Sequence, residues 1–124
     1  MSRGGLLLAF AALASGAGPA DRDRRFFDAR VAPILARRCL PCHNEELKNA
    51  NISFLDRASL LRGGSRGPAI VPGKPDQSVL IRALAHDREV QMPPGPKLPR
   101  KEIAILTEWV RRGAVWGTGL RPAK

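Results

Sequence analysis

The residues with the most specific chemistry form one pentapeptide, Cys39-Leu40-Pro41-Cys42-His43. Its two thiols lie three positions apart, so one helical turn brings both to the same edge of a rigid ligand, and an imidazole follows directly. The pattern C-x-x-C-H is the attachment sequence of c-type haem, in which the sulfurs bond to the porphyrin and the histidine ligates the iron. The pentapeptide therefore predicts one covalent haem c, bound through Cys39 and Cys42 with His43 as an axial iron ligand.

Two other kinds of site could use the same cysteines and histidine. A thioredoxin-like redox pair would require a βαβ context, which the pattern of the chain does not offer. A zinc site would draw on Cys39, Cys42, His43 and His86 as a nominal set of four ligands, although adjacent residues are poor tetrahedral partners. The alternative to a haem protein is thus a small exported zinc- or thiol-containing interaction module without haem.

A haem iron bound by His43 has a sixth position to fill, and Met92 is the best candidate. It is one of two methionines in the chain and begins the stiff segment Met92-Pro93-Pro94-Gly95-Pro96. A thioether ligand favours Fe(II) and raises the reduction potential, which suits electron transfer rather than oxygen chemistry. His86 is the alternative ligand and would give a bis-histidine iron. We therefore expect an electron carrier and not an enzyme; a haem enzyme with an open sixth position is a further alternative.

The elements that must position these residues are helices. Apolar residues recur at helical spacing in four segments, and glycines and prolines separate the segments. Helices are expected over residues 26–39, 56–62, 76–86 and 99–112, where Pro33 either kinks the first helix or starts its main turn. The expected fold is all-α, with three to five short helices and long ordered loops around the cofactor. The helix residues expected in the core are Phe27, Val31, Ile34, Leu35, Val79, Leu80, Ala83, Leu84, Ile103, Leu106, Trp109 and Val110.

Length and charge limit the classes of function. The chain has 124 residues, 44% of them hydrophobic, which allows one domain with one core and excludes a two-domain enzyme built around a cleft. Lys and Arg number 21 against 11 Asp and Glu, for a net charge of +10. Aromatic residues make up only 5% of the chain, so no stacking platform for nucleic acid is expected. The positive field instead favours docking with acidic redox partners.

The first twenty residues are typical of a secretory signal peptide. Arg3 supplies a positive start, residues 6–14 form a short apolar run, and Ala17 or Ala20 offers a cleavage point. The run is too short to span a bilayer, so we expect an exported, periplasmic protein with no stable membrane insertion after cleavage. The expected organisation is a signal peptide over 1–20, a domain over 21–116 and a flexible tail or linker start over 117–124. A monomer is expected.

Four stretches resemble the planctomycete-type cytochrome c domain, a branch of the class I cytochrome c fold. They are residues 39–43, the Gly- and Pro-rich loop 63–75, Met92-Pro93-Pro94 and residues 109–116, and together with the intervening helices they cover most of residues 26–116. The resemblance implies thioethers at Cys39 and Cys42, with His43 as the proximal and Met92 as the distal ligand. It also implies that the carbonyl of Pro68 accepts a hydrogen bond from His43, that Ile70 lies against the haem, and that the first and last helices cross at Phe27 or Trp109.

The sequence departs from the family pattern at three places. Pro99 stands where a serine usually caps the last helix, which removes about 1 kcal/mol of capping. Val115 and Gly117 replace prolines, so the end of the domain is expected to be looser. Family members often continue into larger downstream domains, whereas this sequence stops at Lys124. The chain is either a stand-alone carrier or a fragment, and its partners are redox proteins or such downstream domains.

Overall fold

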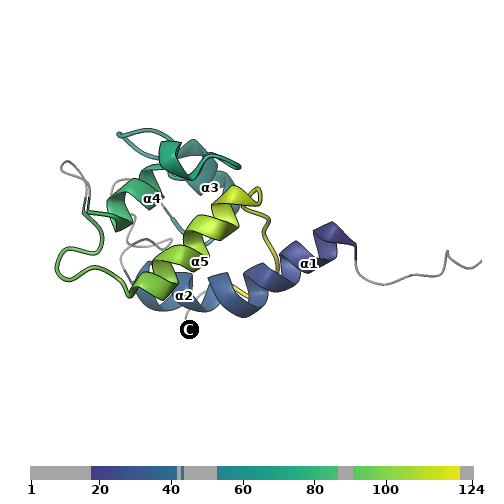
Figure 1. The fold of residues 1–124 in the computed structure, drawn as a ribbon. Helices are drawn as coiled ribbons and strands as arrows, with labels where there is room; N and C mark the ends of the chain where they lie inside the picture. Colours follow the sequence, from purple (N-terminus) through teal and green to yellow (C-terminus); the bar gives the residue numbers. More distant parts are fainter. Residues whose placement is uncertain (1–17, 42, 44–52, 87–90, 121–124) are drawn as a thin grey trace, which may run out of the picture.

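A computed structural model of the chain describes residues 18–41, 43, 53–86 and 91–120. Helices account for the regular structure of these ranges, which contain no strand, and this confirms the predicted all-α class. An isolated bridge pairs Gly64 with Gly67. The elements, shown in Figure 1, are α1 (Pro19–Phe26), η2 (Phe27–Val31, a π-helical turn), α2 (Ala32–Arg38), α3 (Arg57–Arg62), η4 (Pro75–Gln77, a 3-10 turn), α4 (Val79–Leu84) and α5 (Arg100–Arg111).

The first helical segment is longer than the sequence pattern predicts, because α1, η2 and α2 follow one another without a break (Figure 1). The predicted start at residue 26 is wrong: the helix begins at Pro19, within the last two residues of the expected signal peptide. α1 buries no residue, so no apolar periodicity marks it. Pro33 lies in the first turn of α2, which agrees with one of the two expected options, and in the wide turn before α2 the N–H of Ala32 donates to the carbonyl of Phe27.

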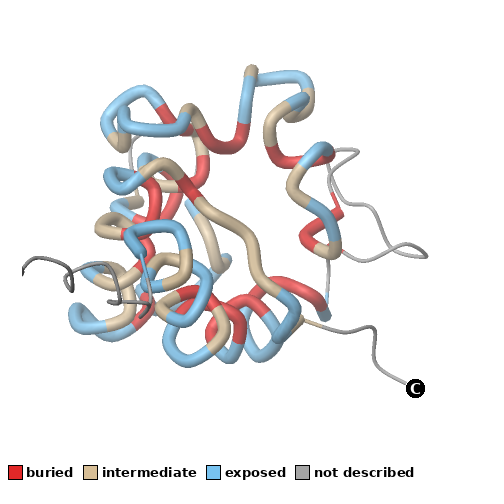
Figure 2. The backbone as a smooth tube through the Cα atoms, turned by 90° about the vertical axis from the view of Figure 1, so that its right-hand side faces the viewer, coloured by how far each residue is buried: buried red, intermediate tan, exposed pale blue. Residues whose placement is uncertain are grey.

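The first and last helical segments meet at aromatic side chains, as predicted. The ring centroids of Phe27 and Trp109 lie 5.7 Å apart, and Trp116 lies 4.5 Å from Phe27. Trp109 is buried, and its indole N–H donates to the carbonyl of Val115 at 2.9 Å, so its polar atom is satisfied. This aromatic cluster anchors α5 on η2, and Figure 2 shows the buried stretches of the helices directed toward the middle of the molecule.

α3 follows the prediction for residues 56–62 closely. Asp56 caps the helix, because its carboxylate accepts the N–H of Ser59 at 2.7 Å. Gly63 ends the helix with a φ of 72°, and a Cβ built there would lie 2.0 Å from the carbonyl oxygen of Gly67. The chain can therefore fold back tightly over Gly63 only because this residue has no side chain.

The helix predicted over residues 76–86 is interrupted. A 3-10 turn, η4, precedes Ser78, whose extended backbone separates it from α4. The buried hydroxyl of Ser78 donates to the carbonyl of Lys74 and accepts the N–H of Val71, so the side chain stabilises this break. Of the twelve helix residues expected in the core, Val79 and Ile103 are only partly buried and the other ten are buried.

α5 begins at Arg100, next to Pro99, which provides no side-chain cap, as the departure from the family pattern predicted. After α5 the chain turns back toward the first helical segment. Gly119 N–H donates to the carboxylate of Asp28 at 2.6 Å, so the first residues of the predicted tail contact η2. Residues 121–124 of that tail, and residues 1–17 of the predicted signal peptide, lie outside the described ranges. In the part of the chain that the structure describes, no helix is both long and apolar enough to cross a membrane.

Candidate functional site

His43 and Met92, the two predicted iron ligands, line the same pocket. The pocket contains about 580 Å³ of empty space, including the part that is open to solvent. Phe54, the loop 64–67 and α4 supply most of the remaining wall, which is almost entirely apolar. The fold thus brings an imidazole and a thioether from distant parts of the sequence to one apolar cavity.

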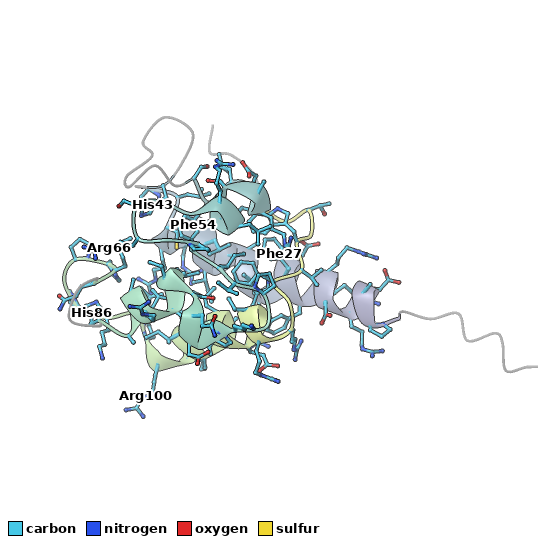
Figure 3. All side chains as sticks on the ribbon, turned by 90° about the horizontal axis from the view of Figure 1, so that it is seen from above. Phe27, His43, Phe54, Arg66, His86 and Arg100 are labelled. Atoms are coloured by element: carbon cyan, nitrogen blue, oxygen red, sulfur yellow. The ribbon has the colours of Figure 1, made fainter. Side chains whose placement is uncertain are left out.

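The backbone of His43 is fixed on both sides. Its N–H donates to the carbonyl of Cys39 at 2.9 Å, and its carbonyl accepts the N–H of Phe54 at 2.7 Å. The imidazole is buried and tilted against the Phe54 ring, with 5.1 Å between the ring centroids (Figure 3). These contacts fix both the position of the main chain and one face of the ring.

Cys39 is also buried, at the end of α2. Burial raises the pKa of its thiol to about 12, because a thiolate would be poorly solvated there. The free thiol is therefore protonated at neutral pH. Cys42 lies outside the described residues, so the predicted pair of thioether bonds and the full zinc ligand set both remain predictions. Among the residues that are described, no group of three or more His, Cys, Asp and Glu could hold a metal ion.

An ion-pair cluster connects the helix before Cys39 to α5. Glu102 accepts hydrogen bonds from Arg38 at 2.9 Å and from Arg37 at 3.2 Å. The hydrogen bond from Arg38 is the main reason that the pKa of Glu102 lies below its ordinary value. The cluster therefore helps to hold the end of α2, from which the C-x-x-C-H segment starts, against the last helix.

Met92 reaches the pocket from the loop that precedes α5. Its side chain is partly buried, and its N–H donates to the carbonyl of Ala83 in α4 at 3.0 Å. His86, the alternative ligand, is not part of the pocket wall. Its Nε2 atom instead lies 3.1 Å from the carbonyl oxygen of Pro93, and Figure 3 shows the residue at the edge of the molecule, apart from His43.

The loop 64–67 forms one rim of the pocket. Reciprocal hydrogen bonds of 3.2 and 3.1 Å between Gly64 and Gly67 close it, and Arg66, an exposed residue of this loop, is one of the residues that line the pocket. Neither Arg66 nor Phe54 was predicted from the sequence as a residue of the site. Phe54 belongs to no motif, and although Arg66 lies within the Gly- and Pro-rich loop, nothing in its spacing distinguishes it from the other arginines of the chain.

Two residues that the resemblance placed near the haem do not line this pocket. The carbonyl of Pro68 accepts the N–H of Val79 at 3.2 Å, and Pro68 itself is exposed. Ile70 is buried in the core, where its N–H donates to the carbonyl of Leu60. Their roles beside the haem therefore remain predictions.

A comparison with known protein families gives a match that includes the pocket residues His43 and Met92. Residues 39–96 match the sequence model of a family described as Planctomycete cytochrome C. No significant match was found among curated proteins or among solved structures. The matched segment starts at the first cysteine of the pentapeptide and includes both His43 and Met92. The match supports the resemblance that the motifs carry: residues 39–96 are similar to the planctomycete cytochromes c.

Proposed function

We propose that the chain is an electron carrier that binds one haem c covalently through Cys39 and Cys42, with His43 and Met92 as axial ligands. The observation that supports this proposal best is that His43 and Met92 line one apolar pocket in the segment that matches the cytochrome family. When bound, the haem supplies a one-electron Fe(III)/Fe(II) couple, and the thioether ligand favours the reduced state.

The residues present fit this group. The apolar wall suits the faces of a porphyrin, and it excludes water from a metal that must change its charge without losing a ligand. The guanidinium of Arg66 matches the carboxylates that a haem carries at its rim. Imidazole nitrogen and thioether sulfur are both ordinary haem ligands.

The proposed setting is periplasmic, after export and removal of a signal peptide. Without residues 1–20, which include Arg3, the chain has 20 Lys and Arg against 11 Asp and Glu, and this net charge of +9 would raise encounter rates with acidic redox partners, whether these are separate proteins or downstream domains. This electrostatic steering would weaken as the ionic strength rises, because exposed charges are screened over about 8 Å in physiological salt.

The test of covalent haem is expression for export in a host with haem-maturation machinery, followed by acid–acetone extraction and a pyridine haemochrome spectrum. We expect haem to remain on the protein through extraction, and the variant in which both Cys39 and Cys42 are alanine to lose it. Pro41→Ala, at an exposed position of the same pentapeptide, is the matched control and should keep its haem. A colourless protein that contains zinc would overturn the proposal and support the exported interaction module.

A further inference from the structure

His86 has an unusual conformation next to the loop that carries Met92. Its φ is 58°, in the left-handed region, which a residue with a side chain adopts at a cost. Its N–H donates to the carbonyl of Ala83 at 2.9 Å, directly beyond α4. This turn directs the half-buried imidazole to the carbonyl of Pro93, with 3.1 Å between Nε2 and the oxygen.

The same carbonyl of Ala83 also accepts the N–H of Met92, at 3.0 Å. One backbone oxygen at the end of α4 thus binds both the turn at His86 and the residue that reaches the pocket. The imidazole adds a third contact, one residue beyond Met92. Two hydrogen bonds, to the N–H of Met92 and to the carbonyl of Pro93, therefore hold this short stretch against α4.

The chemistry of the third contact determines the state of the ring. A carbonyl oxygen can only accept a hydrogen bond, so the Nε2 atom of His86 must carry a proton and donate it to Pro93. A nitrogen that holds this proton has no lone pair for a metal. The contact therefore occupies Nε2 of His86 and leaves a lone pair only on Nδ1.

We propose that His86 is a positioning residue: through the carbonyl of Pro93 it holds the Met92 segment against α4, so that the thioether stays in the pocket that His43 lines. This inference rests on the proposed function, because it concerns the residue assigned there as the distal ligand. Loss of the imidazole should let the Met92 segment leave the pocket more often, without removing Met92 itself.

The role of the ring can be separated from the role of the turn. His86→Gly removes the imidazole and is compatible with the left-handed backbone, so it tests the ring alone. His86→Gln keeps an N–H donor at similar reach and should restore the contact. Ala85→Gly is the matched control, because it adds a glycine at the neighbouring exposed position and leaves His86 unchanged.

The experiment is a titration of the oxidised holoprotein with imidazole, which binds iron only when the methionine has left. Its readout is the weak far-red absorption band of an Fe(III)–thioether bond. Loss of one hydrogen bond should raise the open fraction, and with it the apparent affinity for imidazole, roughly two- to tenfold in His86→Gly. We expect His86→Gln and Ala85→Gly to stay near the wild-type affinity.

The outcomes distinguish this inference from the function on which it rests. A wild-type protein without the far-red band would overturn the assignment of Met92, whatever the variants do. If the wild type has the band, unchanged imidazole affinity in His86→Gly overturns the positioning role. The same holds if Ala85→Gly tightens imidazole binding as much as His86→Gly does, or if His86→Gln behaves like His86→Gly. Should His86→Gly fail to mature, His86→Asn replaces it, since asparagine tolerates the left-handed backbone and its amide is shorter.

Discussion

The substitution Gly63→Ala tests whether the rim of the pocket depends on a close backbone approach. A Cβ at this position would lie 2.0 Å from the carbonyl oxygen of Gly67 and 2.5 Å from the Cα atom of Pro68. Both neighbours are backbone atoms, so the loop itself must move. The φ of 72° adds a conformational cost of about 1–2 kcal/mol for a residue with a side chain.

The displacement has a second cost in hydrogen bonds. Gly67 accepts from Gly64 at 3.2 Å and donates to it at 3.1 Å, and a shift of Gly67 weakens both contacts. At about 0.5–1.5 kcal/mol for each hydrogen bond, the total loss of unfolding free energy in Gly63→Ala is about 2–5 kcal/mol. Because the loop also carries Arg66, we expect the absorption spectrum of the bound haem to change as well.

Gly73→Ala is the matched control for this prediction. Gly73 has a φ of 83°, but a Cβ there would meet nothing within 4 Å. Its expected loss is the conformational cost alone, about 1–2 kcal/mol. Urea unfolding followed by far-ultraviolet circular dichroism measures both variants. If Gly63→Ala destabilises the protein no more than Gly73→Ala does, the close approach contributes nothing and the reasoning is refuted.

Three further substitutions test the packing around the site. Arg57 donates to the carbonyls of Ala114 and Gly113 at 2.7 and 3.1 Å, so Arg57→Lys, which cannot make the two-pronged contact, should lower the unfolding free energy by about 1 kcal/mol. Hydrogen bonds and charges from Arg38 and Arg37 lower the pKa of Glu102, so its ionised form stabilises the fold above the unfolded-state pKa, and this contribution disappears as the pH falls through the folded-state pKa. Glu102→Gln should therefore lower the unfolding free energy by up to about 1 kcal/mol at pH 7 and leave it unchanged in acid. Phe27→Ala should cost about 3–5 kcal/mol, because it leaves a cavity beside the two tryptophans.

Denaturant unfolding measures all three variants, and each has its own contradicting result. Arg62→Lys is the control for Arg57→Lys, and equal losses in the two would show that the carbonyl contacts add no stability. A difference between wild type and Glu102→Gln that does not decrease in acid would contradict the ion pair with Arg38. Unchanged tryptophan fluorescence and stability in Phe27→Ala would contradict the aromatic cluster.

Local sequence signals predicted the parts of the fold that depend on local chemistry. Asp56 and Gly63 marked both ends of α3, since a cap and a left-handed glycine act within a few residues. The start of the first helix was missed because α1 buries nothing; it begins with Pro19 and carries an ion pair between Arg24 and Asp21. Neither feature produces an apolar pattern.

The residues of the candidate site also fall into those that local sequence signals predict and those that they do not. The pentapeptide and the proline-flanked Met92 could be recognised from residue type and spacing. Phe54 and Arg66 could not, because they reach the pocket through the tertiary path of the chain and not through a motif. In the sequence His86 was considered as an alternative ligand. Its contact with Pro93 depends on a left-handed turn, and a histidine in the sequence does not predict such a turn.

The most direct test of the central claim, that His43 and Met92 bind the same covalent haem, is the spectrum of the wild type and of Met92→Ala. The account predicts a far-red thioether band in the oxidised wild type and no binding of carbon monoxide by the reduced wild type at neutral pH. Met92→Ala should keep its covalent haem, lose the band and bind carbon monoxide. A wild type without covalent haem, or a Met92→Ala variant that keeps the band and still excludes carbon monoxide, would contradict the account.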